Sequence, residues 1–223
     1  MSSKVTKSDW KSSLGFFLSH RASYTTDKTL GRNQDLLNDF IRFTEPLGLI
    51  LDVGCGSGEI RKYGNLERYI GIDPVEARLT KFPFIKGMGE FLPFKNSAFD
   101  CAITMATLDH CWSPEQVMTE CGRVLKRNGR IFVWLKVTRT NVIYKLRRLL
   151  HYIKILDYSS LATSIRSNIN TLIKEDTDFH QYGHTQSFTE RSLLKLISSS
   201  FDITRVRWHD QDVFIVGQKR GPQ

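Results

Sequence analysis

The sequence has few cysteines and no long apolar segment. Its 223 residues include four cysteines, none of them in a Cys-x-x-Cys pair, and this pattern favours reduced thiols in a cytosol over a disulfide framework. No apolar run approaches the roughly 20 residues that cross a bilayer. The opening residues, MSSKVTKSDWKSS, lack the apolar core of a secretory signal. We therefore expect a cytoplasmic protein with no metal site at its cysteines.

Acidic side chains are too few to balance the basic ones. The formal net charge is +9 at pH 7, and residues 136–156 contain six basic side chains and no acid. Within 139–156, apolar residues recur at helical spacing while basic ones fall on other faces, which predicts a basic amphipathic helix. Such a helix could pack on the domain with a solvated basic rim. It could instead meet an anionic membrane surface or a phosphate-bearing substrate, so peripheral membrane contact stays open.

A glycine-rich stretch, LILDVGCGSGE from Leu49 to Glu59, follows a short apolar run. Such a run predicts a buried strand that feeds a tight turn, where glycine permits positive φ and the close approach of a ligand. A helix beginning near Glu59 would direct its free N–H groups toward that ligand. The spacing Gly-x-Gly-x-Gly departs from the dinucleotide fingerprint. The carboxylates of Asp52 and Glu59 suit a cationic ligand better than a pyrophosphate, which argues against NAD.

The glycine stretch is the first of several segments that resemble one family. Asp52 to Gly58 is similar to the first motif of class I S-adenosylmethionine-dependent methyltransferases. Further matches follow in order: the second strand with its terminal acid (69–74), the loop after the third strand (86–94), the fourth strand (98–104), and a helix, turn and fifth strand (123–133). The resemblance covers residues 48–135 and is closest to the subgroup that acts on small molecules, lipids and sugars.

This resemblance implies a doubly wound α/β fold with a mostly parallel seven-stranded sheet, an antiparallel last strand and a helical insert. A length of 223 residues suits one such domain and is short for two. We expect a single domain that consists of an N-terminal helical cap (1–45), a cofactor-binding core (46–136), a helical insert that forms a lid and sets specificity (137–186), and a C-terminal helix and hairpin (187–223).

The resemblance also implies a site for S-adenosylmethionine at the carboxyl ends of the strands, where ligands of doubly wound sheets bind. Asp73 lies about 20 residues past the glycine loop, where an acid can accept hydrogen bonds from both ribose hydroxyls. In the family an Asp near the adenine is common after the third strand, but Met88 stands here. Groups of Gly89 or Glu90 would have to replace it. The expected cofactor-binding residues are Asp52, Gly54, Gly56, Asp73, Pro74, Gly89, Glu90, Thr104 and Met105.

Histidines supply the candidate bases, since a hydroxyl acceptor needs a base at hydrogen-bonding distance. His110 follows the fourth strand and is nearest the expected methyl position, although it could also pack or bind the cofactor. His180 and His184 are alternatives, and Asp109 or Asp178 could orient an imidazole. The predicted catalytic set is His110, Asp109 and His184.

The tract DTDFHQYGH, residues 176–184, contains Asp-x-His and His-x-x-x-His spacings that could hold a metal. A loop that lines the acceptor pocket, or a plain surface loop, is favoured over this reading. We therefore predict no metal site in the chain.

The expected function is methyl transfer from S-adenosylmethionine to a small-molecule, lipid-linked or glycan acceptor, with oxygen as the favoured atom. Residues 104–107, Thr-Met-Ala-Thr, lack the Asn/Asp-Pro-Pro-aromatic signature of nucleic-acid amino-methylating enzymes, which argues against nucleic acid as a substrate. An RNA methyltransferase and a non-catalytic cofactor-binding partner subunit stay open as alternatives. The sequence does not predict the acceptor, the methylated atom, the oligomeric state or the pathway.

Overall fold

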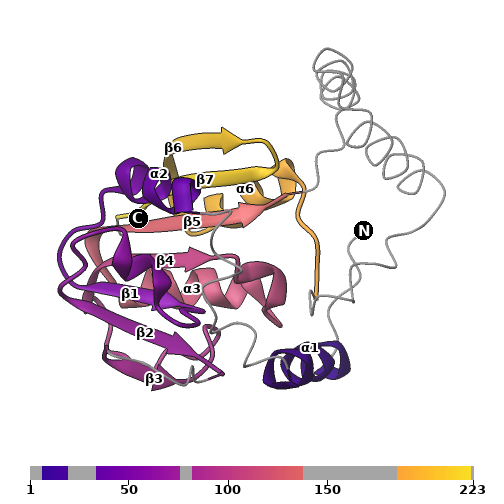
Figure 1. Ribbon diagram of the computed structural model, residues 1–223. Helices are drawn as coiled ribbons and strands as arrows, with labels where there is room; N and C mark the ends of the chain where they lie inside the picture. Colours follow the sequence, from indigo (N-terminus) through magenta and orange to yellow (C-terminus); the bar gives the residue numbers. More distant parts are fainter. Residues whose placement is uncertain (1–6, 20–33, 76–81, 138–184, 222–223) are drawn as a thin grey trace, which may run out of the picture.

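The computed structural model describes residues 7–19, 34–75, 82–137 and 185–221. Within these ranges seven strands form one sheet in the order β3-β2-β1-β4-β5-β7-β6 (Figure 1). Strands β1 to β5 pair in parallel, and β7 pairs antiparallel with both β5 and β6. This arrangement confirms the predicted fold class. The strands are β1 (Ile50–Val53), β2 (Tyr69–Asp73), β3 (Phe84–Lys86), β4 (Phe99–Met105), β5 (Leu125–Lys136), β6 (Phe201–His209) and β7 (Asp212–Lys219).

Helices cover both faces of the sheet. On one face α2 (Gln34–Thr44) buries Leu37, Phe40 and Phe43. On the other face lie α3 (Pro114–Val124) and α6 (Glu190–Ser198), which contact each other. The described part of the chain also includes α1 (Lys7–Ser19), which Figure 1 draws on the side toward which the arrowheads of β1 and β2 point. None of the described helices is long and apolar enough to cross a membrane.

Period-2 alternation divides the side chains of β5 between two cores. Ile131, Val133 and Leu135 pack with the residues of α3 and α6, whereas Phe132 and Trp134 pack with those of α2. On the α2 side, the ring of Phe40 lies 5.6 Å from that of Trp134 and 5.1 Å from that of Phe214. Such aromatic pairs add about 1 kcal/mol each beyond their burial. The cores on both faces therefore fix the sheet whose edge carries the candidate site.

Helix α3 begins where its sequence signals predict. The side chain of Ser113 accepts a hydrogen bond from the backbone N–H of Gln116 at 3.3 Å, and Pro114 occupies the first helical position. The Asn128-Gly129 pair predicts that this helix runs to about residue 126, but it ends at Val124. Leu125 is already extended and pairs with Phe99, so β5 begins three residues before Asn128, ahead of the predicted turn at Asn128 and Gly129.

The glycine loop is followed by a single 3-10 turn, η3 (Glu59–Lys62), and not by an α-helix. Gly58 precedes this turn in the left-handed conformation, and Gly64 follows it closely, which discourages further helix. Glu59 forms an ion pair with Lys62 at 2.9 Å. The helix expected near Glu59 is therefore absent from this described segment, and a macrodipole contributes little beside the loop.

The strand order places a topological switch between β1 and β4. The chain passes from β1 to β2 and β3 on one side, then returns to form β4 on the other side of β1. Doubly wound sheets bind ligands beside such a switch, at the carboxyl ends of the strands. The described chain stops at Val137 after β5 and resumes at Thr185.

Candidate cofactor and acceptor site

The three glycines of the loop after β1 have positive φ values of 74° for Gly54, 49° for Gly56 and 68° for Gly58. A Cβ on Gly54 would overlap the side chain of Thr107, and one on Gly58 would overlap Phe82. A Cβ on Gly56 would meet nothing within 4 Å. Gly54 and Gly58 are thus required for close packing within the protein, whereas Gly56 borders open space that a ligand could occupy.

Asp73 connects the end of β2 to the glycine loop. Its Oδ2 accepts a hydrogen bond from the N–H of Gly56 at 3.0 Å, and its Oδ1 accepts one from Val75 at 2.8 Å. Burial raises the pKa of Asp73, while the two backbone donors and nearby His110 oppose that rise. Pro74 follows at the bend after the strand. A carboxylate offers about four acceptor sites, so Asp73 retains capacity for two hydroxyl donors.

Asp52 is buried at the carboxyl end of β1. The hydroxyl of Tyr69 donates a hydrogen bond to its Oδ2 at 2.5 Å, and its Oδ1 has no hydrogen-bond partner among the described residues. Burial raises the pKa of Asp52 to about 7; the hydrogen bond from Tyr69 opposes this rise and the charge of Asp73 adds to it. No sequence pattern predicts the contact with Tyr69, because an aromatic residue that opens a strand is ordinarily only part of the core.

These features fit a ribose-bearing cation such as S-adenosylmethionine. Open space lies beside Gly56, Asp73 retains acceptor capacity, and a buried oxygen of Asp52 lacks a donor. A positively charged ligand would stabilise both carboxylates in their ionised form. A pyrophosphate in the same place would be repelled by them.

The loop after β3 approaches the same edge. A Cβ on Gly89 would come within 2.7 Å of Val53, so glycine is needed there for the loop to pack on β1. The side chain of Glu90 is buried, and its Oε1 accepts hydrogen bonds from the N–H groups of Trp112 at 2.8 Å and Ser113 at 3.2 Å. Glu90 thereby fastens this loop to the start of α3. A contact of Gly89 or Glu90 with adenine stays a prediction.

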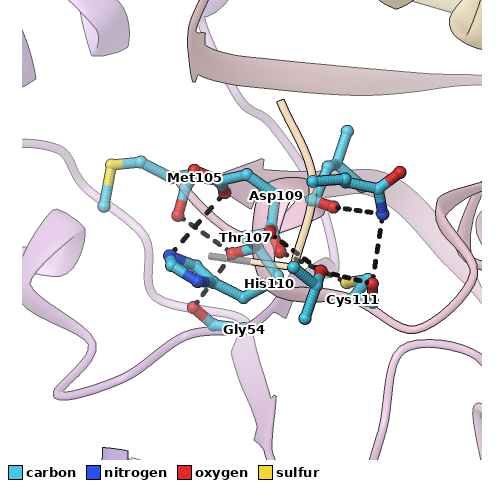
Figure 2. A network of polar contacts seen from close by, with 9 residues as sticks. Gly54, Met105, Thr107, Asp109, His110 and Cys111 are labelled. Carbon is cyan, nitrogen blue, oxygen red and sulfur yellow. Dashed lines mark hydrogen bonds and ion pairs between the residues drawn. The ribbon is translucent and has the colours of Figure 1, made fainter. Parts of the chain in front are cut away.

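The turn after β4 is locked to the glycine loop through Thr107. Its hydroxyl oxygen lies 2.9 Å from the carbonyl oxygen of Met105 and 3.4 Å from that of Gly54 (Figure 2). Thr104 is buried on the strand, and its hydroxyl has no hydrogen-bond partner among the described residues. Ala106 has a φ of 48°, a conformation that L-residues other than Asn and Asp seldom adopt. The chain therefore turns sharply at the predicted methyl position.

His110 and Asp109 lie together in η4 (Leu108–His110), a 3-10 turn that follows β4. The Nε2 of His110 is 3.8 Å from the Oδ1 of Asp109, and Figure 2 shows the two side chains beside the turn that carries Thr107. The imidazole is 21% exposed, so it is accessible from solvent. The structure thus brings together two of the three predicted catalytic residues. His184, like His180 and Asp178, lies outside the described residues.

Thr185 and Gln186, which come from a later part of the chain than β5, contact η4. Thr185 donates from its backbone N–H and its hydroxyl to the carbonyl oxygen of Asp109, at 2.8 and 3.0 Å. No local sequence signal predicts this contact, because the two residues are 76 positions apart.

A family model described as a methyltransferase domain matches residues 51–133. An uncharacterised protein of Methanocaldococcus jannaschii is 32% identical over 132 residues, which cover 56% of this chain and 49% of that protein. The ubiquinone biosynthesis O-methyltransferase of Vibrio atlanticus is 32% identical over 97 residues, or 37% of this chain and 41% of that enzyme. The chain thus spans about half the length, or less, of these curated relatives.

A solved structure from Thermotoga maritima, of a SAM-dependent methyltransferase described as a possible histamine N-methyltransferase, has the same fold. The two chains superpose with a TM-score of 0.64 at 20% identity, covering 92% of this chain and 99% of the other. The strand order, the matched segment and the geometry of the glycine loop agree with one another. Residues 51–133 therefore match a methyltransferase domain, and the described chain has the fold of a SAM-dependent methyltransferase.

Proposed function

We propose that this chain transfers a methyl group from S-adenosylmethionine to an oxygen of a small-molecule or lipid-linked glycan acceptor. The observation that carries this proposal is the pair of carboxyl groups, Asp52 and Asp73, beside a glycine loop with open space at Gly56. When bound, the cofactor supplies a methyl group already activated by a sulfonium. The residues of the chain have to hold the cofactor, align the acceptor and exclude water.

Each predicted cofactor residue has a role in this proposal that its position supports. Asp73 accepts hydrogen bonds from the ribose hydroxyls, and the unpartnered oxygen of Asp52 accepts from a cationic group. The backbone at Gly54 and Gly56 lines the cofactor, as do Pro74 after β2, Gly89 and Glu90 after β3, and Thr104 and Met105 at the end of β4.

Proton removal from the acceptor is assigned to His110. Its imidazole is partly exposed next to the turn after β4, and the carboxylate of Asp109 lies 3.8 Å from its Nε2, where it can orient the ring. His184 is the alternative base. The printed name of the Vibrio atlanticus relative, an O-methyltransferase, supports oxygen as the methylated atom. We assign the protein to the cytoplasm, with a peripheral membrane contact through the basic segment 139–156, which lies outside the described residues.

The test of this function is the acceptor-dependent release of S-adenosylhomocysteine by the whole chain. Hydroxylated aromatic compounds and lipid-linked glycans are the expected acceptors, with amines and RNA as comparison substrates. His110→Gln is expected to lower kcat by about 10²-fold or more, as removal of a general base does, while cofactor affinity changes little. Turnover confined to RNA, or cofactor binding without turnover on any acceptor, would favour the two alternative functions and overturn this one.

A further inference from the structure

The carbonyl oxygens of η4 converge on two residues that come from a distant part of the sequence. The backbone N–H and hydroxyl of Thr185 donate to Asp109, and the hydroxyl also lies 2.9 Å from the carbonyl oxygen of Cys111. Gln186 donates from its backbone N–H to Asp109 at 3.3 Å. Its side-chain amide donates to Leu108 at 3.5 Å and to Cys111 at 3.1 Å. Thr185 and Gln186 therefore contact two carbonyl oxygens of η4, those of Leu108 and Asp109, and the carbonyl oxygen of Cys111 directly after it.

The turn depends on these donors for its conformation. A 3-10 turn of three residues satisfies few of its own carbonyl groups, and no side chain caps the start of η4. Leu108 and Asp109 are buried, so water is a poor substitute for the missing partners. The donors of Thr185 and Gln186 supply partners for the carbonyl groups of Leu108, Asp109 and Cys111.

The residue that precedes this turn contacts the glycine loop. Thr107 immediately precedes η4, and its hydroxyl contacts the carbonyl oxygens of Met105 and Gly54 (Figure 2). The segment that bears Asp109 and His110 is thus held between the loop after β1 and residues 185–186.

We propose that Thr185 and Gln186 are positioning residues for methyl transfer, which set η4 and through it the direction of the His110 imidazole. This inference rests on the proposed function. It assigns them no contact with cofactor or acceptor. Because a misplacement of about 1 Å can lower a rate about 10²-fold, their effect falls on kcat. The affinity for S-adenosylmethionine, which depends on Asp52, Asp73 and Gly56, is unaffected.

Two substitutions at Thr185 distinguish the effect of its hydroxyl group from the effect of its side-chain volume. Thr185→Val keeps the side-chain volume and the backbone N–H but loses both hydroxyl contacts, whereas Thr185→Ser keeps the hydroxyl. We expect kcat to fall by about tenfold or more in Thr185→Val, with cofactor affinity within about twofold of wild type, and to recover in Thr185→Ser. Gln186→Met, which removes the amide donors at similar volume, is expected to behave as Thr185→Val does.

Thr189→Val is the matched control. Thr189 caps α6 through its hydroxyl, which accepts from the N–H of Ser192 at 3.2 Å. This control is expected to lower the melting temperature and leave kcat unchanged. Unchanged kcat in folded Thr185→Val, or an equal loss of kcat in Thr185→Val and Thr189→Val, would mean that residues 185–186 only anchor the chain.

A second readout does not depend on turnover. In the whole protein without cofactor, the NMR signal of the His110 imidazole, assigned by its loss in His110→Gln, is expected to shift in Thr185→Val. It should stay at its wild-type position in Thr185→Ser and Thr189→Val. If the His110 signal shifts in Thr185→Val but the wild-type protein transfers no methyl group, the proposed function is wrong, while the inference that Thr185 positions His110 is retained. An unchanged His110 signal in Thr185→Val would contradict the inference that Thr185 positions the imidazole.

Discussion

Asp52 is a buried carboxyl group next to the glycine loop, and we propose that its charge decides what the loop can bind. Burial raises its pKa to about 7, partly opposed by the hydrogen bond from Tyr69 and reinforced by the charge of Asp73. Below this pH most molecules carry a proton on Asp52 before a ligand arrives. A cationic cofactor favours the ionised form, so binding below about pH 7 must release that proton.

We therefore predict that the affinity for S-adenosylmethionine rises about tenfold between pH 6 and pH 8, as the ionised fraction of one group with this pKa does. Calorimetric titration in buffers of different ionisation enthalpy should show proton release at pH 6 that fades by pH 8. Asp52→Asn should bind more weakly at pH 8 and lose this dependence. Tyr69→Phe should move the midpoint to higher pH, because it removes the hydrogen bond that stabilises the carboxylate. A flat profile in wild type would contradict the role of Asp52.

Ala106 stores backbone strain at the end of β4. Its φ of 48° costs an alanine about 1 kcal/mol or more relative to glycine. We predict that Ala106→Gly is neutral or raises the free energy of unfolding by up to about 1 kcal/mol. The control is Ala102→Gly in the middle of the same strand, which should lower stability by about 1 kcal/mol. Urea unfolding measures both variants, and losses of the same size at the two positions would show that Ala106 is unstrained.

At the scale of elements, Arg123 fastens the loop between β3 and β4 to α3. Its guanidinium donates to Glu120 at 2.7 and 2.8 Å and to the carbonyl oxygens of Phe94 at 2.7 Å and Leu92 at 2.8 Å. The hydrogen bond with Arg123 is also the main reason that the pKa of Glu120 lies below its usual value. One planar group thus connects a helix to two points of the loop.

Arg123→Lys is predicted to lower the free energy of unfolding by about 1–3 kcal/mol, because an ammonium cannot span these acceptors. The loss should be greatest above about pH 5 and shrink as Glu120 becomes protonated in more acidic solution. Thermal unfolding at pH 7 and pH 4 measures this change, with the exposed Arg127→Lys as control. Equal stability of the two variants at pH 7 would contradict the role given to Arg123.

Elements with strong local signals could be predicted from sequence. The start of α3 follows from Ser113 and Pro114, and the glycine loop follows from the apolar run that ends at Gly54. Element boundaries could not be predicted in this way. Strand β5 begins at Leu125 because that residue pairs with Phe99. The segment after the glycine loop forms only the single turn η3. The order of the strands became predictable only through the family resemblance, since period and composition do not specify neighbours in a sheet.

The candidate site likewise contains residues that could be predicted from the sequence and contacts that could not. Residues adjacent to a motif, such as Gly56, Asp73 and His110, could be placed from sequence because strand ends meet at one edge. Contacts between distant residues could not. The bond from Tyr69 to Asp52 and the engagement of Glu90 by Trp112 depend on side-chain directions that no spacing encodes.

At the scale of the whole molecule, the fold gathers the loops after β1, β2, β3 and β4 at one edge of the sheet. Hydrogen bonds join these loops: Asp73 links β2 to the glycine loop, Thr107 links β4 to it, and Glu90 links the β3 loop to α3. The edge is thus preorganised by the protein itself, as a site that must align reactants requires.

Calorimetric titration with S-adenosylmethionine and S-adenosylhomocysteine tests the central claim, that this edge binds the cofactor, most directly. Wild type is expected to bind both at micromolar concentration. Asp73→Ala should lose on the order of tenfold or more in affinity. The surface control Asp202→Ala, which breaks only an exposed pair with Arg220, should bind as wild type does. Folded wild-type protein that binds neither ligand at near-millimolar concentration, or Asp73→Ala that binds as tightly as wild type, would contradict the account.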